Sequence, residues 1–119
     1  MSAPPDITIN GPPIGVNQMY WFRNGIKFLT TRARDWKEAA QWEVRSQWKQ
    51  GVLTGRIGVT LHVFFADQRK RDLDNTAKPA LDSLTGIVFE DDSQVMDLHM
   101  LKDVDRDKPR MEIWIKKLP

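Results

Sequence analysis

Residues 57–66 of the sequence read IGVTLHVFFA. Most of these residues are β-branched or aromatic, which favours extended backbone over helix. An apolar run of this length, with few polar side chains, is typical of a strand in the interior of a sheet. We therefore expect residues 57–66 to form a central strand, with the other elements packed around it.

Two strand signals precede this segment. Residues 6–10, DITIN, alternate apolar and polar side chains as a half-buried strand does, and Gly11 with two prolines ends the pattern. Further on, Asn24-Gly25 separates YWFR from IKFL. Asn-Gly between two strand-like runs is the strongest short-range signal for a hairpin, so we expect an antiparallel hairpin over about residues 19–30.

A long helix is expected to follow the hairpin. Thr30 or Thr31 can cap its amino end, and Gly51 can stop it. One stripe of side chains recurs at about 100° per residue and would face the core. Trp42 projects from the opposite side of this helix. The stripe consists of Ala33, Trp36, Ala40, Val44 and Trp48.

The second half of the chain alternates strands and one short helix. We expect a helix over about 75–85, an acidic turn at 90–92, and strands over about 94–103 and 110–116, joined by an exposed turn. This order predicts an α+β fold with a single mixed β-sheet and helices largely on one face.

The composition limits what the protein can be. A chain of 119 residues and 13.8 kDa fits one domain, residues 1–119. With no cysteine there can be no disulfide framework, thiolate nucleophile or cysteine-based metal site. No apolar run approaches the roughly 18 residues of a membrane span, and no signal peptide is recognisable. We expect a cytoplasmic protein with no membrane partner.

The charges are distributed unevenly along the chain. Residues 1–60 contain 8 basic and 4 acidic residues, whereas residues 61–119 contain 10 basic and 12 acidic ones. A basic half joined to a half with clustered acids suits a metal-assisted enzyme that acts on a polyanion. The same asymmetry also arises by chance in small proteins, so it supports this hypothesis only weakly.

The densest group of chemically active residues is RKRDLDNTAK at 69–78, directly after the expected central strand. Loops in this position often carry functional groups on a rigid scaffold. In extended backbone, Asp72 and Asp74 would point to the same side. If the next helix begins near Asn75, Lys78 lies one turn beyond Asp74 and can face the same cleft.

Paired carboxylates of this kind favour a divalent cation, because the cation removes their mutual repulsion. Mg²⁺ binds one or two carboxylates while it keeps water and phosphate oxygens as its other ligands. A third carboxylate would complete the site, and Asp91 or Asp92 in a later loop could supply it. The three basic residues before the first aspartate suit contacts with DNA phosphates, and they are Arg69, Lys70 and Arg71.

Simpler explanations exist for each of these features. Asp74 or Asn75 can merely cap the helix, residues 69–71 can be a solvated face, and residues 91–92 can form an ordinary polar turn. His62, among apolar neighbours, is expected to be structural rather than a ligand. The co-occurrence of the charged motifs in one small domain favours a metal site. No motif of serine hydrolases or P-loop enzymes is present.

The same residues are similar to those of a known family. The chain resembles the RusA family of Holliday junction resolvases over about residues 6–116. The specific part of the resemblance consists of KRDLDN at 70–75, Lys78, DSLT at 82–85 and DDSQV at 91–95. A looser part consists of Pro12-Pro13, Asn17, Tyr20 and Leu29-Thr30.

The resemblance implies a dimeric endonuclease that uses Mg²⁺, or Mn²⁺, to cut four-way junction DNA in recombination and repair. Such enzymes are often carried by phages or prophages, and they leave 5′-phosphate ends. It implies that Asp72, Asp74 and Asp92 are the catalytic and metal-binding acids and that Lys78 is the essential lysine.

A competing hypothesis is a branched-DNA-binding accessory module without catalysis, in which the aspartates are caps and turn residues. Paired nicks in a two-fold symmetric junction favour a homodimer. Trp42 and the aromatic side chains of the 20–28 hairpin could contribute to its interface.

Overall fold

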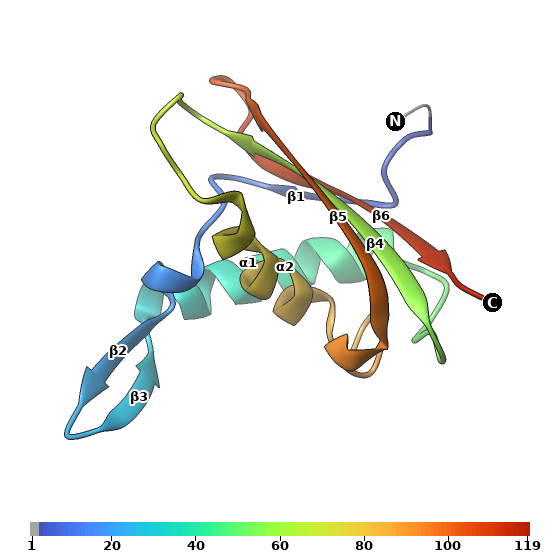
Figure 1. Cartoon of the computed structure of the whole chain (residues 1–119), viewed down its shortest axis with the longest axis horizontal. Coiled ribbons are helices and arrows are strands. Elements are labelled where there is room, and N and C mark those ends of the chain that lie inside the picture. The colour runs from blue at the N-terminus through green and yellow to red at the C-terminus, as the bar shows by residue number, and fades with distance from the viewer. Residues whose placement is uncertain (1–2) are drawn as a thin grey trace.

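A four-stranded mixed sheet forms the centre of the computed structural model, which describes residues 3–119 (Figure 1). The strand order is β1-β6-β4-β5. β4 pairs parallel to β5 and antiparallel to β6, and β1 pairs antiparallel to β6. The strands are β1 (Ile7–Asn10), β4 (Ile57–Phe65), β5 (Val95–Val104) and β6 (Arg110–Lys117). The predicted α+β class and the interior position of residues 57–66 are confirmed.

The core lies on one face of this sheet, between β4 and the helices α1 (Thr31–Gln47) and α2 (Ala77–Leu84). Alternate residues of β4 are buried there, as the two-residue period of a strand requires. Because side chains of both helices join the same cluster, the helices cover the same face. The buried residues from these three elements are Ile57, Val59, Leu61, Val63, Phe65, Ala40, Val44, Ala80 and Leu84.

Helix α1 begins where the sequence predicts but ends earlier. The hydroxyl of Thr30 caps it by accepting a hydrogen bond from the backbone N–H of Ala33 at 3.1 Å. The prediction that the helix continues to about Gly51 is wrong. Trp48 leaves helical backbone, and its indole N–H donates to the carbonyl of Gly51 at 2.7 Å. This turn buries the Trp48 ring in the core.

The expected hairpin is confirmed, but it does not join the main sheet. β2 (Tyr20–Arg23) and β3 (Ile26–Leu29) form a separate two-stranded sheet that extends away from the rest of the molecule (Figure 1). Asn24 and Gly25 both have positive φ, 52° and 74°. This is the turn conformation that Asn-Gly favours, because its twist matches that of the two strands.

Three short 3₁₀ turns connect these elements: η1 (Val16–Gln18), η2 (Leu73–Thr76) and η3 (Asp92–Gln94). The helix expected to begin near Asn75 begins at Ala77, because η2 takes up the preceding residues. Among residues 3–119, no helix is both long and apolar enough to cross a lipid bilayer. Met1 and Ser2, which the expected domain includes, lie outside the described residues.

Candidate active site

A cleft of about 370 Å³ opens beside the loop that follows the carboxyl end of β4. Its wall combines the segment around η1 with the end of β4 and the start of η2, so residues far apart in the sequence meet there. The position agrees with the predicted site, since this loop carries the RKRDLDN motif. The lining residues are Pro13, Gly15, Asn17, Gln18, Phe65, Lys70, Arg71, Asp72, Asn75 and Thr76.

The carboxylates of Asp72 and Asp74 are exposed and have no partner in the described part of the chain. Neither makes a side-chain hydrogen bond or ion pair with residues 3–119. Asp72 stands at the N-cap position of η2 without capping it, and Thr76, the N-cap of α2, makes no side-chain cap either. Asp74 and Asn75 therefore do not act as helix caps, and the carboxylates stay available to bind a ligand.

The backbone at these two aspartates differs from the expectation. Extended geometry would have given Asp72 and Asp74 a common direction, but Asp74 lies within the 3₁₀ turn η2. Only Asp72 lines the cleft. The prediction of extended backbone is wrong because η2 starts one residue after Asp72. The backbone N–H of Asn75 donates to the backbone carbonyl of Asp72 at 3.2 Å and closes this turn.

Part of the basic stretch before Asp72 is neutralised. Arg71 forms a bidentate ion pair with Asp67 through both of its terminal nitrogens. Arg69 Nε lies 3.7 Å from the same carboxylate. The hydrogen bond from Arg71 is the main reason that the pKa of Asp67 falls to about 2. Lys70 makes no ion pair within residues 3–119, and it lines the cleft.

Lys102 on β5 fastens this loop to the sheet, a role that the sequence does not predict. Its ammonium donates to the backbone carbonyl of Arg71 at 2.9 Å. It also lies 5.8 Å from the centre of the Phe65 ring, and the Arg71 guanidinium lies 5.0 Å from the same centre. These contacts hold the residue before Asp72 in place and keep two cations at the edge of the cleft.

Lys78 lies on the first turn of α2, as expected, but it forms an ion pair with Asp82 and does not face the cleft. The ammonium lies 3.5 Å from Asp82 Oδ1, one turn further along the helix. The cleft lining does not include Lys78. The Lys78 side chain is 48% exposed, so its ion pair with Asp82 lies in water and is weak.

The structure separates the roles of Asp91 and Asp92. Asp91 caps η3 by accepting from the backbone N–H of Ser93 at 3.2 Å, and the Gln94 side chain reaches back to the N–H of Asp91. Hydrogen bonds from Ser93 lower the pKa of Asp91. The Asp92 carboxylate is exposed and makes no such contact within residues 3–119. Asp91 therefore matches the polar-turn explanation, whereas the Asp92 carboxylate makes no contact that would give it a structural role in the turn.

Asp92 does not join the other two aspartates within one chain. Asp72 and Asp74 lie at the amino end of α2, whereas η3 follows its carboxyl end (Figure 1). Among residues 3–119, no three His, Cys, Asp or Glu side chains are grouped closely enough to hold a metal ion. The expected convergence of three carboxylates in one loop region is therefore not seen in a single chain.

Amide side chains complete the polar wall of the cleft, and of these the sequence singles out only Asn17 and Asn75. Gln18 Oε1 accepts from the backbone N–H of Gly15 at 3.0 Å, which orders the η1 segment. A Cβ atom at Gly15 would lie 2.8 Å from Asn17 Oδ1 and 3.3 Å from the Cβ of Asn75. Glycine is therefore needed where η1 and η2 approach each other across the cleft.

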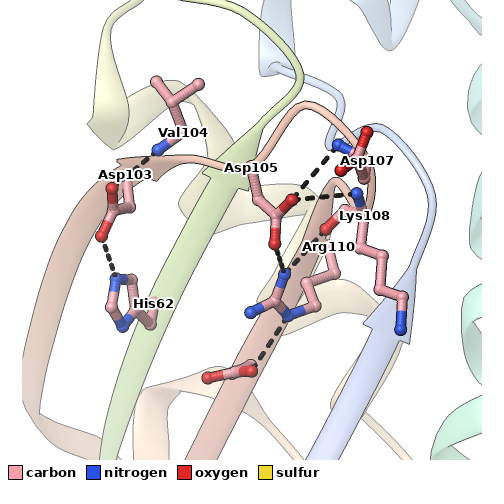
Figure 2. A network of polar contacts seen from close by, with 8 residues as sticks. His62, Asp103, Val104, Asp105, Asp107, Lys108 and Arg110 are labelled. Carbon is pink, nitrogen blue, oxygen red and sulfur yellow. Dashed lines mark hydrogen bonds and ion pairs between the residues drawn. The ribbon is translucent and has the colours of Figure 1, made fainter.

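A second charged cluster lies at the turn between β5 and β6, and its contacts are satisfied internally (Figure 2). Asp105 accepts from Arg110 at 2.7 Å and from the N–H groups of Asp107 and Lys108. The Arg110 guanidinium also donates to Glu112 at 3.0 Å. The hydrogen bond from Arg110 is the main cause of the lowered pKa of Asp105.

His62 belongs to the same cluster, on the sheet face opposite the helices. Its Nε2 atom lies 3.5 Å from Asp103 (Figure 2). Its ring stacks on that of Phe64, with the ring centres 4.1 Å apart. The expectation that His62 is structural is supported by these contacts. The cluster stabilises a turn, and its residues are not among those that line the cleft.

The free oxygens near the cleft fit a hard divalent cation. Mg²⁺ takes one or two carboxylates and keeps water or phosphate oxygens as further ligands, and Asp72 and Asp74 provide carboxylates without competing partners. Lys70 and Arg71 add positive charge beside them. An anionic substrate such as a phosphodiester could therefore lie along this cleft with its charge balanced.

Comparison with known proteins identifies relatives along nearly the whole chain. A family model described as Endodeoxyribonuclease RusA matches residues 10–116. The Crossover junction endodeoxyribonuclease rusA of Enterobacteria phage HK97 is 32% identical over 102 residues, which cover 83% of this chain and 84% of that protein. The protein of that name from Aquifex aeolicus (strain VF5) is 28% identical over 95 residues, covering 79% and 75%. The one from Escherichia coli (strain K12) is 26% identical over 113 residues, covering 94% and 93%.

Proposed function

Since this chain belongs to the RusA family of Holliday junction resolvases, we propose that it cuts four-way junction DNA by Mg²⁺-dependent hydrolysis of phosphodiesters. The products are paired symmetric nicks with 5′-phosphate ends, and Mn²⁺ can replace Mg²⁺. The reaction belongs to DNA recombination and repair, in the cytoplasm where the DNA lies. Residues 1–119 act as one nuclease domain.

The observation that carries this proposal is the pair of unpartnered carboxylates beside a basic cleft. A structural aspartate at a helix start would cap backbone N–H groups, and neither Asp72 nor Asp74 does so. Exposed acids next to Lys70 and Arg71 would simply form ion pairs if stability were their role. Because the carboxylates of Asp72 and Asp74 are available, the site favours a metal cation together with a negatively charged substrate.

Each residue has a separate task in this proposal. Asp72 and Asp74 hold the cation, which when bound supplies an activated water and neutralises the phosphate. Lys70 contacts a backbone phosphate from the wall of the cleft, and Arg69 and Arg71 add to the positive field. Lys78 leaves its weak pair with Asp82 and stabilises the charge that develops during cleavage.

Asp92 takes part in the same site only if a second chain or a rearrangement of residues 90–94 brings it there. A C₂ homodimer is the simpler of these, because a four-way junction needs two nicks in opposed strands and C₂ is the commonest homo-oligomer symmetry. Trp42, 69% exposed, is available for such an interface. Light scattering at micromolar concentration should report about twice the chain mass of 13.8 kDa.

The decisive experiment uses a labelled synthetic four-way junction with and without Mg²⁺. Binding in EDTA is expected under either hypothesis. Paired nicks after addition of Mg²⁺ are expected only of a resolvase. Binding without any cleavage, in Mg²⁺ and in Mn²⁺, would instead favour the non-catalytic accessory module.

A further inference from the structure

The β2–β3 hairpin exposes apolar side chains that no other part of the described chain covers. Figure 1 shows it extending from the side of the molecule, beyond the sheet and both helices. The rings of Trp21 and Phe28 stack on each other at 4.5 Å, and both stay partly open to solvent. Phe22, near the tip, is 69% exposed, and Ile26 is 57% exposed. Neighbouring residues of a strand point to opposite sides, so Phe22 lies on one face of the hairpin and Trp21, Phe28 and Ile26 lie on the other. Exposed apolar side chains of this kind mark a binding surface.

Cations alternate with these apolar side chains. Across the hairpin, Phe22 pairs with Lys27 and Ile26 pairs with Arg23, so a cation stands opposite each apolar residue near the tip. Residues 16–34 contain four basic residues and no acidic residue. Aromatic rings interleaved with cations are the arrangement with which proteins bind exposed nucleobases and the phosphates that join them.

The charge of the hairpin disfavours a second copy of itself as the partner. A two-fold axis passing through the hairpin would place Arg23 and Lys27 next to their own copies. No carboxylate within residues 16–34 could compensate that repulsion. A polyanion with apolar base faces matches both properties of the surface.

The hairpin has a firm base next to the candidate active site. Thr30 closes it by donating its backbone N–H to the carbonyl of Met19 at 2.7 Å and its hydroxyl to that of Gln18 at 2.8 Å. Met19 is buried in a small cluster with Ile14 and Ala33. Gln18 itself lines the cleft beside Asp72. The chain therefore passes from the cleft wall directly into the hairpin.

This arrangement sets the reach of the hairpin from the cleft. Strands of four residues extend about 13 Å at about 3.3 Å per residue. Stacked bases follow one another at about 3.4 Å, so the hairpin spans roughly four of them. DNA with a phosphate in the cleft would thus bring nearby bases within reach of Phe22 and Trp21.

We propose that the β2–β3 hairpin recognises junction DNA by entering the branch point, where Trp21 on one face of the hairpin and Phe22 on the other stack against unstacked bases, while Arg23 and Lys27 contact the adjacent phosphates. This inference rests on the proposed function, and it adds the element that distinguishes a branch point from continuous duplex. Bases inside a duplex are already stacked on their neighbours and offer no free face.

The test compares binding to a four-way junction with binding to a linear duplex of the same sequence, in EDTA. Phe22→Ala and Trp21→Ala should each weaken junction binding about tenfold, as loss of one stacked base does, and change duplex binding much less. Val52→Ala removes a similarly exposed apolar side chain from the loop after α1 and should change neither. In the junction, 2-aminopurine at the branch point should lose fluorescence on binding to the wild-type protein and keep it with Phe22→Ala.

Substitutions at Phe22 separate stacking from simple apolar docking. Phe22→Trp keeps a π-face and should retain junction binding, whereas Phe22→Leu keeps only apolar area and should not. Equal junction binding by Phe22→Ala, Trp21→Ala and wild type would overturn the proposal. So would a fall of the scattering mass to that of one chain in Phe22→Ala, because it would assign the hairpin to a protein interface. Failure of the wild type to cut junctions in Mg²⁺ would contradict the proposed function instead.

Discussion

Two charged segments follow strands at the same end of the sheet, and they differ in where their unpaired charges lie. In the β5–β6 turn, Asp105 and Arg110 are joined to each other and to backbone groups. In the loop after β4, Asp67 and Arg71 form a similar pair, but Asp72, Asp74 and Lys70 are left without a partner within residues 3–119. Both segments also contain charges that form no ion pair within residues 3–119, such as Arg106 and Lys108 in the turn, but only Lys70 and Asp72 of the β4 loop line the cleft.

The difference explains why one segment is a candidate site. Paired charges hold a backbone conformation and are already neutral when a ligand arrives. Unpaired charges gain from a ligand, because a cation or phosphate supplies the missing partner. In the β4 loop the Asp67–Arg71 pair fixes the backbone, and Asp72, directly after it, lines the cleft. Substitutions in the two segments should therefore differ in kind.

The largest effect is expected at the first aspartate of the motif. Asp72→Asn should lower the rate of junction cleavage by more than about 100-fold, because it removes a metal ligand and even supporting partners of ligands cost about 10–100-fold. Junction binding in EDTA should stay equal or tighten slightly, since one negative charge near DNA is lost. The matched variant Asp105→Asn should cut at the normal rate when folded. If both variants cut normally, unpaired charge does not mark the active site.

Lys78→Ala should lower the cleavage rate about 100-fold, the scale on which a group that stabilises developing charge contributes. Lys78→Arg should recover part of the rate, because a guanidinium cannot fully replace a compact ammonium. Single-turnover cleavage at saturating enzyme, over a series of Mg²⁺ concentrations, gives the measurement. A change in the Mg²⁺ concentration needed, without a change in maximal rate, would contradict this role.

Arg110→Gln should lower the free energy of unfolding by about 1.5–3 kcal/mol, the usual contribution of hydrogen bonds to a charged group. It removes the contacts to Asp105 and Glu112 and the guanidinium that lies 3.8 Å from the centre of the Phe64 ring. Urea denaturation measures the loss, and cleavage per folded molecule should not change. Unaltered stability would show that these pairs behave as ordinary surface ion pairs.

A smaller effect is expected at Lys70, the basic residue that lines the cleft and forms no ion pair within residues 3–119. Lys70→Gln should reduce the slope of log affinity for duplex DNA against log salt concentration by about 0.9, the value for one phosphate contact. Arg106→Gln, in the β5–β6 turn, should leave the slope unchanged. Titrations followed by fluorescence anisotropy at several salt concentrations measure both. Equal slopes in all three proteins would place the phosphates elsewhere.

The smallest effect is a dependence of stability on acid. The pKa of Asp67 is about 2 in the folded protein, below its ordinary value of 3.8. A carboxyl whose pKa is depressed by folding stabilises the protein above its ordinary pKa, and this contribution is lost as the pH falls through about 2. The difference in melting temperature between wild type and Asp67→Asn should therefore shrink from about pH 5 to about pH 2. A constant difference would contradict the Asp67–Arg71 pair.

Much of the fold could be predicted because it depends on local patterns. The apolar run at 57–66, the Asn24-Gly25 turn and the cap at Thr30 each specify their own conformation. The end of α1 could not be predicted, since it depends on burial of Trp48 against residues distant in sequence. Likewise, hydrophobic alternation indicates that residues 20–29 pair with each other, but it does not indicate whether they join the main sheet.

The candidate site was predictable in its residues and less so in its geometry. RKRDLDN identifies Asp72 and Lys70, because their types and spacing suit a metal and phosphates. The conformation of η2 and the capping of η3 by Asp91 depend on hydrogen bonds to particular neighbours, so spacing alone could not separate Asp91 from Asp92. The contact of Lys102 with the Arg71 carbonyl depends on the parallel pairing of β4 and β5.

The position of β6 has a consequence for synthesis of the protein. β6 is the last of the strands along the chain, yet it lies between β1 and β4. While a ribosome is making the chain, β1 has no partner strand and β4 lacks one of its two neighbours until residues 110–117 emerge. Because the sheet cannot close earlier, the core that supports the loop after β4 forms late. A nascent chain that already contains the RKRDLDN motif is therefore not yet a folded nuclease.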